Sequence, residues 1–309
     1  MRLYHHKSAA NHIVPDGHPE RPERIKAVQD VLAKTCHDVP YFEAPLATDA
    51  QLALVHDEGY LKHLFSLNVE DGLRALDGDT FLSPHSIEAA RRGAGAACAA
   101  VDALLQGQDD RAFVAMRPPG HHAEPDKAMG FCFFSNAAIA ARYAQTQYGV
   151  ERVAVIDFDV HHGNGTQAAF WDRPDCFYAS THEMPLFPGT GHPSETGAGS
   201  VMNLPLQAGM DGQDFLQAWG LLIKQLTQAG PELVILSAGF DAHQADPLAN
   251  INLKSDDFYE VTARLVALAE TTAQGRVISL LEGGYDLQAL QDSVHYHLLA
   301  LQGLEKVAL

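Results

Sequence analysis

Two carboxylates and an imidazole alternate along the segment RVAVIDFDVHHGNGTQ, which changes from an apolar run to a glycine-rich one. They are Asp157, Asp159 and His161. Side chains two residues apart lie on the same side of an extended chain, so these three groups are expected close together. Carboxylates and imidazoles are common metal ligands, and the trio is a candidate metal site. An Asp-x-His pattern is also typical of a hydrogen-bonded turn, so the rest of the chain must decide between these interpretations.

Three further segments place reactive side chains after short apolar runs. The motif RPPGHH ends in His121 and His122, and its prolines and glycine predict a sharp, rigid turn. Adjacent imidazoles in such a turn are candidates for an acid–base pair. The motif AGFDAH contributes the carboxylate of Asp241, and EGGY contributes Tyr285, whose phenol can approach a site closely because two glycines precede it.

These groups together predict metal-assisted hydrolysis of an amide or an ester. Asp159, His161 and Asp241 supply three ligands and leave a coordination position open, as catalytic zinc sites do. Such an ion would lower the pKa of a water molecule and polarise a carbonyl group. The tandem histidines would transfer protons, and Tyr285 would donate a hydrogen bond to the developing oxyanion.

Strands that alternate with helices are expected to position these groups. Strands are predicted at residues 2–4, 41–43, 112–116, 153–158, 176–181, 232–237 and 276–281. Helices are predicted to begin near Pro22 and to cover residues 48–67, 83–105, 136–148, 165–171, 213–229, 255–273 and 287–301. The pattern predicts one α/β domain over residues 1–309, with a mainly parallel sheet covered on both faces by helices. In such sheets ligands bind beyond the carboxyl ends of the strands, where all four reactive segments fall.

The amino-acid composition and net charge indicate which kinds of molecule the protein can bind. The 309 residues are 46% hydrophobic and 19% charged, and 21 basic against 39 acidic residues give a net charge of −18. This charge argues against a nucleic-acid partner and favours cationic or neutral ones, although it also serves solubility. No apolar run is long enough to cross a bilayer and no signal sequence is present, so we expect a cytoplasmic protein with no membrane partner. The four cysteines are far apart, which predicts neither a disulfide framework nor a thiolate zinc site.

Six motifs resemble those of the histone deacetylase family, especially its class II branch and the bacterial class II-like amidohydrolases. They are HPERPERI (residues 18–25), RPPGHHAEPDKAMGFCFF (117–134), DFDVHHGNGTQ (157–167), FPGTG (187–191), SAGFDAHQADPL (237–248) and LEGGYD (281–286). The resemblance covers nearly the whole chain, and the motifs occur in the order typical of the family.

The resemblance implies an arginase/deacetylase fold and zinc-dependent removal of an acyl group from an amine. It implies Asp159, His161 and Asp241 as zinc ligands, His122 as general base and acid, His121 as its electrostatic helper, and Tyr285 as the oxyanion donor. Asp157 and Asn164 would be the partners of the two histidines, and an asparagine at position 164 is the class II choice.

The resemblance also implies a substrate tunnel and a second ion. The alkyl chain of the substrate would lie between Phe131 and Phe187, with Gly130 at the wall and Leu248 at the rim. A structural potassium ion would be bound by Asp157, by backbone carbonyls such as those of Asp159 and His161, and at the positions of Ser180 and Thr181.

Positions at which this sequence differs from related branches of the family indicate which substrates to expect. Leu248 stands where the polyamine-selective vertebrate branch has a glutamate, and residues 13–18 lack the long insertion with which bacterial acetylpolyamine amidohydrolases build a dimer. Tyr285 is retained, unlike in the branch where a histidine replaces it. The expected substrate is an acylated lysine or an acylated small amine, and the sequence leaves this choice, the acyl length and the oligomeric state open.

Two other functions fit part of the pattern. A binuclear manganese hydrolase of the arginase type would use the same carboxylates, but it needs a second aspartate where this chain has His243. A non-catalytic protein that binds acyl-amines would keep the fold without the chemistry, and the intact set of ligands, histidines and tyrosine argues against it.

Overall fold

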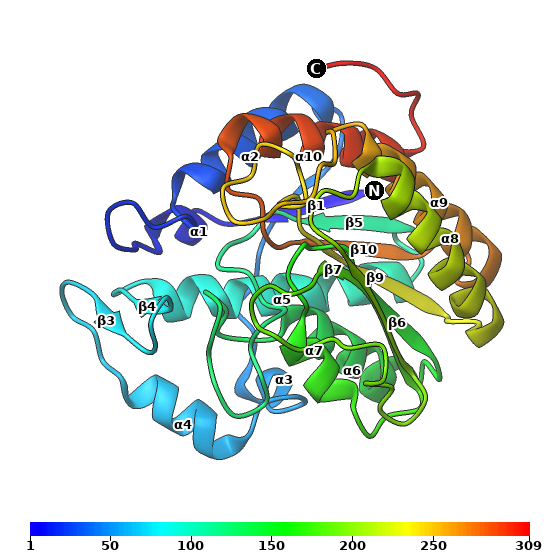
Figure 1. The fold of residues 1–309 in the computed structure, drawn as a ribbon. Helices are drawn as coiled ribbons and strands as arrows, with labels where there is room; N and C mark the ends of the chain where they lie inside the picture. The colour runs from blue at the N-terminus through cyan, green and yellow to red at the C-terminus, as the bar shows by residue number, and fades with distance from the viewer.

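Eight parallel strands form the main sheet of the protein, shown in Figure 1 for the computed structural model of residues 1–309. In spatial order the strands are β2 (Tyr41–Glu43), β1 (Arg2–His5), β5 (Arg111–Val114), β10 (Val277–Leu281), β9 (Leu233–Ala238), β6 (Val153–Asp157), β7 (Cys176–Glu183) and β8 (Val201–Leu206). Two short strands, β3 (Arg74–Ala75) and β4 (Phe81–Leu82), form a separate antiparallel pair. The predicted α/β fold with a mainly parallel sheet is therefore confirmed.

Helices cover both faces of the sheet. They are α1 (Ser8–Asn11), α2 (Glu23–Thr35), α3 (Asp49–Leu52), α4 (Glu58–Ser66), α5 (Ser86–Leu105), α6 (Asn136–Tyr148), α7 (Asn164–Phe170), α8 (Gly212–Ala229), α9 (Asp257–Thr272) and α10 (Leu287–Gln302). Figure 1 shows α2, α8, α9 and α10 on one face and α5 and α6 on the other. Every residue of β6, β9 and β10 is buried, which explains why these strands are continuous apolar runs rather than alternating ones.

The four strands that carry the reactive segments are neighbours in the sheet. Their order is β5, β10, β9 and β6, although β5 and β10 are separated by more than half of the chain. Because all four strands run in the same direction, their carboxyl ends meet at one edge of the sheet. The fold thus brings the tandem histidines, Tyr285, Asp241 and the Asp-x-Asp-x-His segment to one place.

The single helix predicted over residues 48–67 is wrong. The structure divides this segment into α3 and α4, and His56 lies in the connection between them. The buried His56 ring lies 3.1 Å from the carbonyl oxygen of Glu124 and accepts the N–H of Ser135 at 2.9 Å. These tertiary hydrogen bonds replace the helical continuation that the apolar spacing predicted. Tyr60 donates to the carbonyl of Phe133 at 2.7 Å, so His56 and Tyr60 both have structural roles.

The edge strand β8 was not predicted from the sequence. It contains Asn203 and Pro205, which are uncommon in strands, and proline is tolerated there because β8 has a neighbour on one side only. The four cysteines are buried and free. None of the helices has both the length and the apolar character that crossing a membrane requires.

Candidate active site

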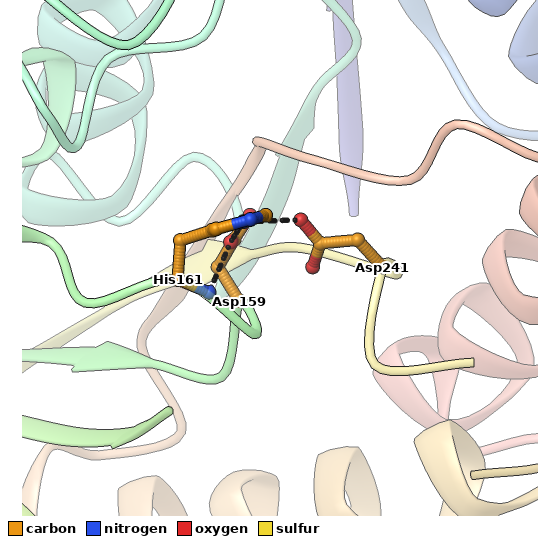
Figure 2. A group of neighbouring side chains, drawn as sticks. All are labelled: Asp159, His161 and Asp241. Carbon is orange, nitrogen blue, oxygen red and sulfur yellow. Dashed lines mark hydrogen bonds and ion pairs between the residues drawn. The ribbon is translucent and has the colours of Figure 1, made fainter. Parts of the chain in front are cut away.

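Asp159, His161 and Asp241 form a buried cluster at the carboxyl ends of β6 and β9 (Figure 2). Their ligand atoms all lie within 4.8 Å of one another. The Nδ1 atom of His161 lies 3.0 Å from Oδ2 of Asp241 and 3.2 Å from Oδ1 of Asp159. Figure 2 shows both carboxylates turned toward this nitrogen, so one position lies next to all three groups.

The charges of this cluster fit a bound cation. Burial raises the pKa of Asp241, and the neighbouring negative charge of Asp159 raises it further. Burial alone would lower the pKa of His161, but its hydrogen bonds with Asp159 and Asp241 raise it to about 10. The imidazole proton therefore supplies positive charge between two buried carboxylates. A divalent ion held by the same three atoms would supply that charge in its place.

Glycines allow the backbone to pack directly against the two carboxylates. A Cβ atom at Gly283 would lie 2.2 Å from Oδ2 of Asp241, and one at Gly239 would lie 2.1 Å from Oδ2 of Asp159. Gly283 also donates its N–H to Oδ2 of Asp159 at 2.8 Å. These glycines of the SAGFD and LEGGY motifs are therefore required by close packing around the cluster.

The tandem histidines lie in the turn after β5, with ring centroids 3.9 Å apart. The Nδ1 atom of His121 lies 3.1 Å from Oδ2 of Asp157, and that of His122 lies 2.8 Å from Oδ1 of Asn164. Asn164 donates from Nδ2 to Glu124 at 2.7 Å, which fixes its orientation. One histidine therefore has a carboxylate partner and the other a neutral amide.

The surroundings of His121 and His122 give the two rings different protonation states. Burial would lower the pKa of His121, but Asp159 and Asp157 outweigh it and raise this pKa to about 10. Burial lowers the pKa of His122 well below its ordinary value of 6.5, and the positive charges of His121 and His161 lower it further. The site therefore holds a charged and a neutral imidazole side by side, an arrangement that can divide acid and base roles.

Tyr285 is buried and held in place in spite of the two glycines before it. Its backbone N–H donates to Asp246 at 2.7 Å, and the carbonyl of Gly284 accepts from Nε of Arg24 at 2.6 Å. Burial and the nearby charge of Asp241 raise the pKa of the phenol well above 10. The hydroxyl therefore keeps its proton and can donate a hydrogen bond.

A cavity of about 190 Å³ leads to the histidines and the cluster. It is lined by His122, Gly130, Phe131, His161, Leu186, Phe187, Leu248 and Tyr285. Phe187 is 41% exposed and therefore lies at the mouth. At the wall, a Cβ atom at Gly130 would lie 2.5 Å from the His122 ring, so a side chain there would displace the histidine. All four residues predicted to bind substrate thus line one cavity.

The residues predicted to bind potassium lie on neighbouring strands and on the loop after β6. Asp157 of β6 is paired with Ser180 of β7 in the sheet register. The Oγ atom of Ser180 lies 2.9 Å from Nδ1 of His182. Thr181 is buried, and its Oγ1 atom has no hydrogen-bond partner.

Sequence reasoning missed three residues of this region. Leu186 precedes Phe187 and could have been found as the second apolar residue of the loop MPLFPG. Arg24 was interpreted only as part of a helix start, but its guanidinium reaches the loop that carries Tyr285. Asp246 lies within the motif SAGFDAHQADPL, but the contact with Tyr285 that gives it a role forms only after folding.

His243 does not extend the cluster toward a second metal ion. Its Nε2 atom lies 3.2 Å from Oγ of Ser255, and its Nδ1 atom accepts the N–H of Ala245 at 3.1 Å. The group of possible ligands contains Asp159, His161 and Asp241 alone. These contacts do not favour a binuclear manganese site.

Comparisons with known proteins agree with this geometry. A family model described as "Histone deacetylase domain" matches residues 18–301. The chain is 42% identical over 278 residues to the "Histone deacetylase-like amidohydrolase" of Pseudomonas aeruginosa, covering 87% of this chain and 73% of that protein. It is 34% identical over 292 residues to a "Probable deacetylase" of Archaeoglobus fulgidus, covering 92% and 80% of the two chains.

A solved structure extends the similarity to three dimensions. The crystal structure of the HDA15 HD domain matches with a TM-score of 0.91 and 30% sequence identity, covering 98% of this chain and 91% of that one. This match confirms the arginase/deacetylase type of α/β fold that the motifs implied.

Proposed function

The chain belongs to the histone deacetylase family, a family of deacetylases and amidohydrolases, and on that premise we propose that it is a zinc-dependent amidohydrolase that removes acetyl or other short acyl groups from amines. One observation carries the proposal. A charged and a neutral histidine lie beside a buried cluster of two carboxylates and an imidazole, at the inner end of an apolar cavity.

Asp159, His161 and Asp241 would hold one zinc ion per chain. Two oxygen ligands and one nitrogen ligand match the donors of catalytic zinc sites. When bound, the ion would polarise the acyl carbonyl and lower the pKa of the attacking water. Hydrogen bonds from the N–H groups of His161 and Val160 to the carboxylates, both at 2.9 Å, would fix the ligand orientations.

His122 would act as the general base and then as the general acid. Its ring is neutral and lines the cavity, and its Nδ1 atom is occupied by Asn164, which leaves Nε2 free to take a proton from water. The same nitrogen would return the proton to the leaving amine. His121, held protonated by Asp159 and Asp157, would stabilise the negative charge that develops nearby.

Tyr285 would donate its phenolic hydrogen to the oxyanion of the tetrahedral intermediate. Its raised pKa keeps that proton available over the physiological range. The fixed backbone around it means that the donor is oriented before the substrate arrives, which reduces the reorganisation needed during the reaction.

The cavity favours an uncharged alkyl chain that ends in an acylated amine. Phe131 and Phe187 supply aromatic surface, and no acidic or basic side chain other than the two histidines lines the walls. Leu248 leaves the rim without charge, so a cationic group outside the tunnel gains no ion pair there. We therefore favour an acylated lysine or a comparable acylated amine and do not expect strict polyamine selection.

We also expect a structural potassium ion beneath the cluster. Asp157 and the backbone carbonyls of Asp159 and His161 would bind it from β6, and Ser180 and Thr181 would bind it from β7. The pairing of Asp157 with Ser180 and the unpartnered hydroxyl of Thr181 support this assignment.

The test is an activity panel on protein of known metal content. We expect about one zinc per chain and hydrolysis of a fluorogenic acetyl-lysine peptide, inhibited by a hydroxamate that binds zinc. The panel includes an acetylated polyamine and longer acyl-lysines to identify the substrate class. His122→Asn is the matched control, since it should keep zinc and lose turnover. If the zinc-loaded protein hydrolyses none of these amides, the proposal is overturned. The alternative of a non-catalytic protein that binds acyl-amines would then be favoured.

A further inference from the structure

Glu282 is a fully buried acid to which neither the motifs nor the proposed mechanism assigns a role. It is 1% exposed and follows the last residue of β10, three positions before Tyr285. Its Oε2 atom accepts the backbone N–H of Gly120 at 2.7 Å and that of His121 at 3.2 Å. The side chain therefore crosses from the tyrosine loop to the turn that carries the tandem histidines.

The histidine turn needs an acceptor supplied from outside. Pro118 and Pro119 have no backbone N–H, so Gly120 and His121 contribute the first donors after the two prolines. Gly120 and His121 are both buried, and a buried N–H without a partner costs about 1–3 kcal/mol. The strands β5 and β10 are adjacent in the sheet, which places the carboxylate of Glu282 where those donors point.

The same turn is fixed from its other side. The carbonyl oxygen of His121 accepts the N–H groups of Gly165 and Thr166, at 3.0 and 3.2 Å. Glu282 itself is held through its main chain, because its carbonyl accepts Nη2 of Arg24 at 2.5 Å and its N–H donates to Ala238 at 3.0 Å. The position of the carboxylate is therefore determined independently of the histidines that it contacts.

We propose that Glu282 is a positioning residue, which fixes the backbone of the tandem histidines in the frame of the strand that also carries Tyr285. Through this residue the acid–base pair and the oxyanion donor form one rigid unit. The expected effect on turnover rests on the proposed function. The claim that Glu282 fixes the backbone of Gly120 and His121 does not depend on it.

Three substitutions of Glu282 distinguish the position of its acceptor oxygen from the ability of its side chain to carry a charge. Glu282→Gln keeps an oxygen acceptor at the same reach, and its amide nitrogen would replace Oε1, which has no hydrogen-bond partner to lose. Glu282→Asp keeps the carboxyl group but is shorter by one C–C bond of about 1.5 Å, so it cannot hold both N–H groups. Glu282→Ala removes the acceptor and the charge together.

The kinetic readout is the separation of kcat from KM on the acetyl-lysine peptide, with zinc content measured for each variant. Glu282→Ala and Glu282→Asp should lose about 10- to 100-fold in kcat, since a displacement near 1 Å has that cost, while KM changes less than about threefold. Glu282→Gln should restore kcat to within about threefold of the parent. Glu183→Ala is the matched control, because Glu183 is also a buried acid that accepts two N–H donors, both from Asn250. It should lose stability and keep its kcat.

The direct readout is the backbone amide resonances of Gly120 and His121 in the zinc-loaded protein. Their proton shifts should be preserved in Glu282→Gln and move upfield in Glu282→Asp and Glu282→Ala. This measurement decides the geometric claim even if no acyl-amine is turned over, in which case only the proposed function fails. The inference would be overturned if Glu282→Asp were active while Glu282→Gln was inactive, or if the amide shifts were unchanged in Glu282→Asp. These two variants still decide the question if Glu282→Ala does not fold.

Discussion

The Oδ2 atom of Asp246 accepts the backbone N–H of Tyr285 at 2.7 Å. Its other oxygen accepts the N–H of Leu248 at 3.0 Å, so one buried carboxylate holds both the phenol and the rim of the cavity. The Tyr285 ring stands edge-on to Phe131, with centroids 6.0 Å apart. The oxyanion donor is therefore oriented by packing and hydrogen bonds, although two flexible residues precede it.

Tyr285→Phe should reduce kcat by roughly 100- to 1,000-fold, the effect of losing one oxyanion donor. Zinc content and folding should not change, because the phenol is not a proposed ligand. KM should change little, since this hydrogen bond strengthens only as charge develops on the carbonyl oxygen. Single-turnover kinetics on an acetyl-lysine peptide provide the measurement, and a parental rate for the chemical step would contradict the assignment.

Asp241→Ala and His161→Ala should each lose bound zinc together with activity, because each removes one of three ligands. Metal analysis after dialysis against a weak chelator measures the loss. His243→Ala is the control, since this residue is bonded to Ser255 outside the cluster and should keep its zinc. Stoichiometric zinc in both ligand variants would show that the ion binds elsewhere.

Phe131→Ala and Phe187→Ala should each lower kcat/KM for an acetyl-lysine substrate by roughly 10-fold, equivalent to about 1.4 kcal/mol of lost aromatic contact. Trp171→Ala is a suitable control, because this exposed aromatic residue does not line the cavity. The substrate would have to bind at another place if both tunnel variants kept parental kinetics.

Leu248→Glu should raise the efficiency on an acetylated polyamine several-fold relative to the neutral acetyl-lysine peptide. The new carboxylate at the rim would attract the free ammonium groups of the polyamine. The gain should shrink as salt is raised, because an exposed charge pair is screened. Equal effects on cationic and neutral substrates, or a gain that salt does not change, would contradict this explanation.

His297 should make folding sensitive to acid. It is fully buried between the hydroxyls of Thr262 and Ser279, at 2.7 and 2.8 Å, and burial lowers its pKa from 6.5 to about 3. Between these values the unfolded chain binds a proton that the folded chain does not, so stability present above pH 6.5 is lost as the pH falls. The loss reaches roughly 2 kcal/mol at pH 5.

The measurement is urea unfolding of the parent and of His297→Gln at pH 7 and pH 5. The variant lacks this titration, so the stability advantage of the parent should shrink by that amount at pH 5. A difference between the two proteins that is independent of pH would show that folding does not lower the pKa of His297.

Much of the site could be predicted from the sequence, because its residues lie at the ends of continuous apolar runs. The rule that ligands bind beyond the carboxyl ends of parallel strands then placed the tandem histidines, Tyr285 and Asp241 together. The order of the strands was not predictable in this way. The adjacency of β5 and β10 depends on pairing between residues far apart in the chain, which leaves no local pattern.

Residues that act through long-range contacts were missed for the same physical reason. Nothing beside Asp246 in the sequence indicates that its carboxylate holds Tyr285. The division of residues 48–67 into two helices likewise results from hydrogen bonds of His56 with the Glu124 carbonyl and the Ser135 N–H. Local spacing predicted the elements, whereas contacts across the fold determined where two of them end.

The place of β10 between β5 and β9 has a consequence for synthesis of the chain. Strand β10 ends at Leu281, so it leaves the ribosome after every other strand of the sheet. Until it is inserted, β5 with β1 and β9 with β6 form two separate groups, and the middle of the sheet exposes apolar surface. A chain interrupted before β10 would therefore lose its centre rather than an edge, and we expect such products to aggregate or to be degraded.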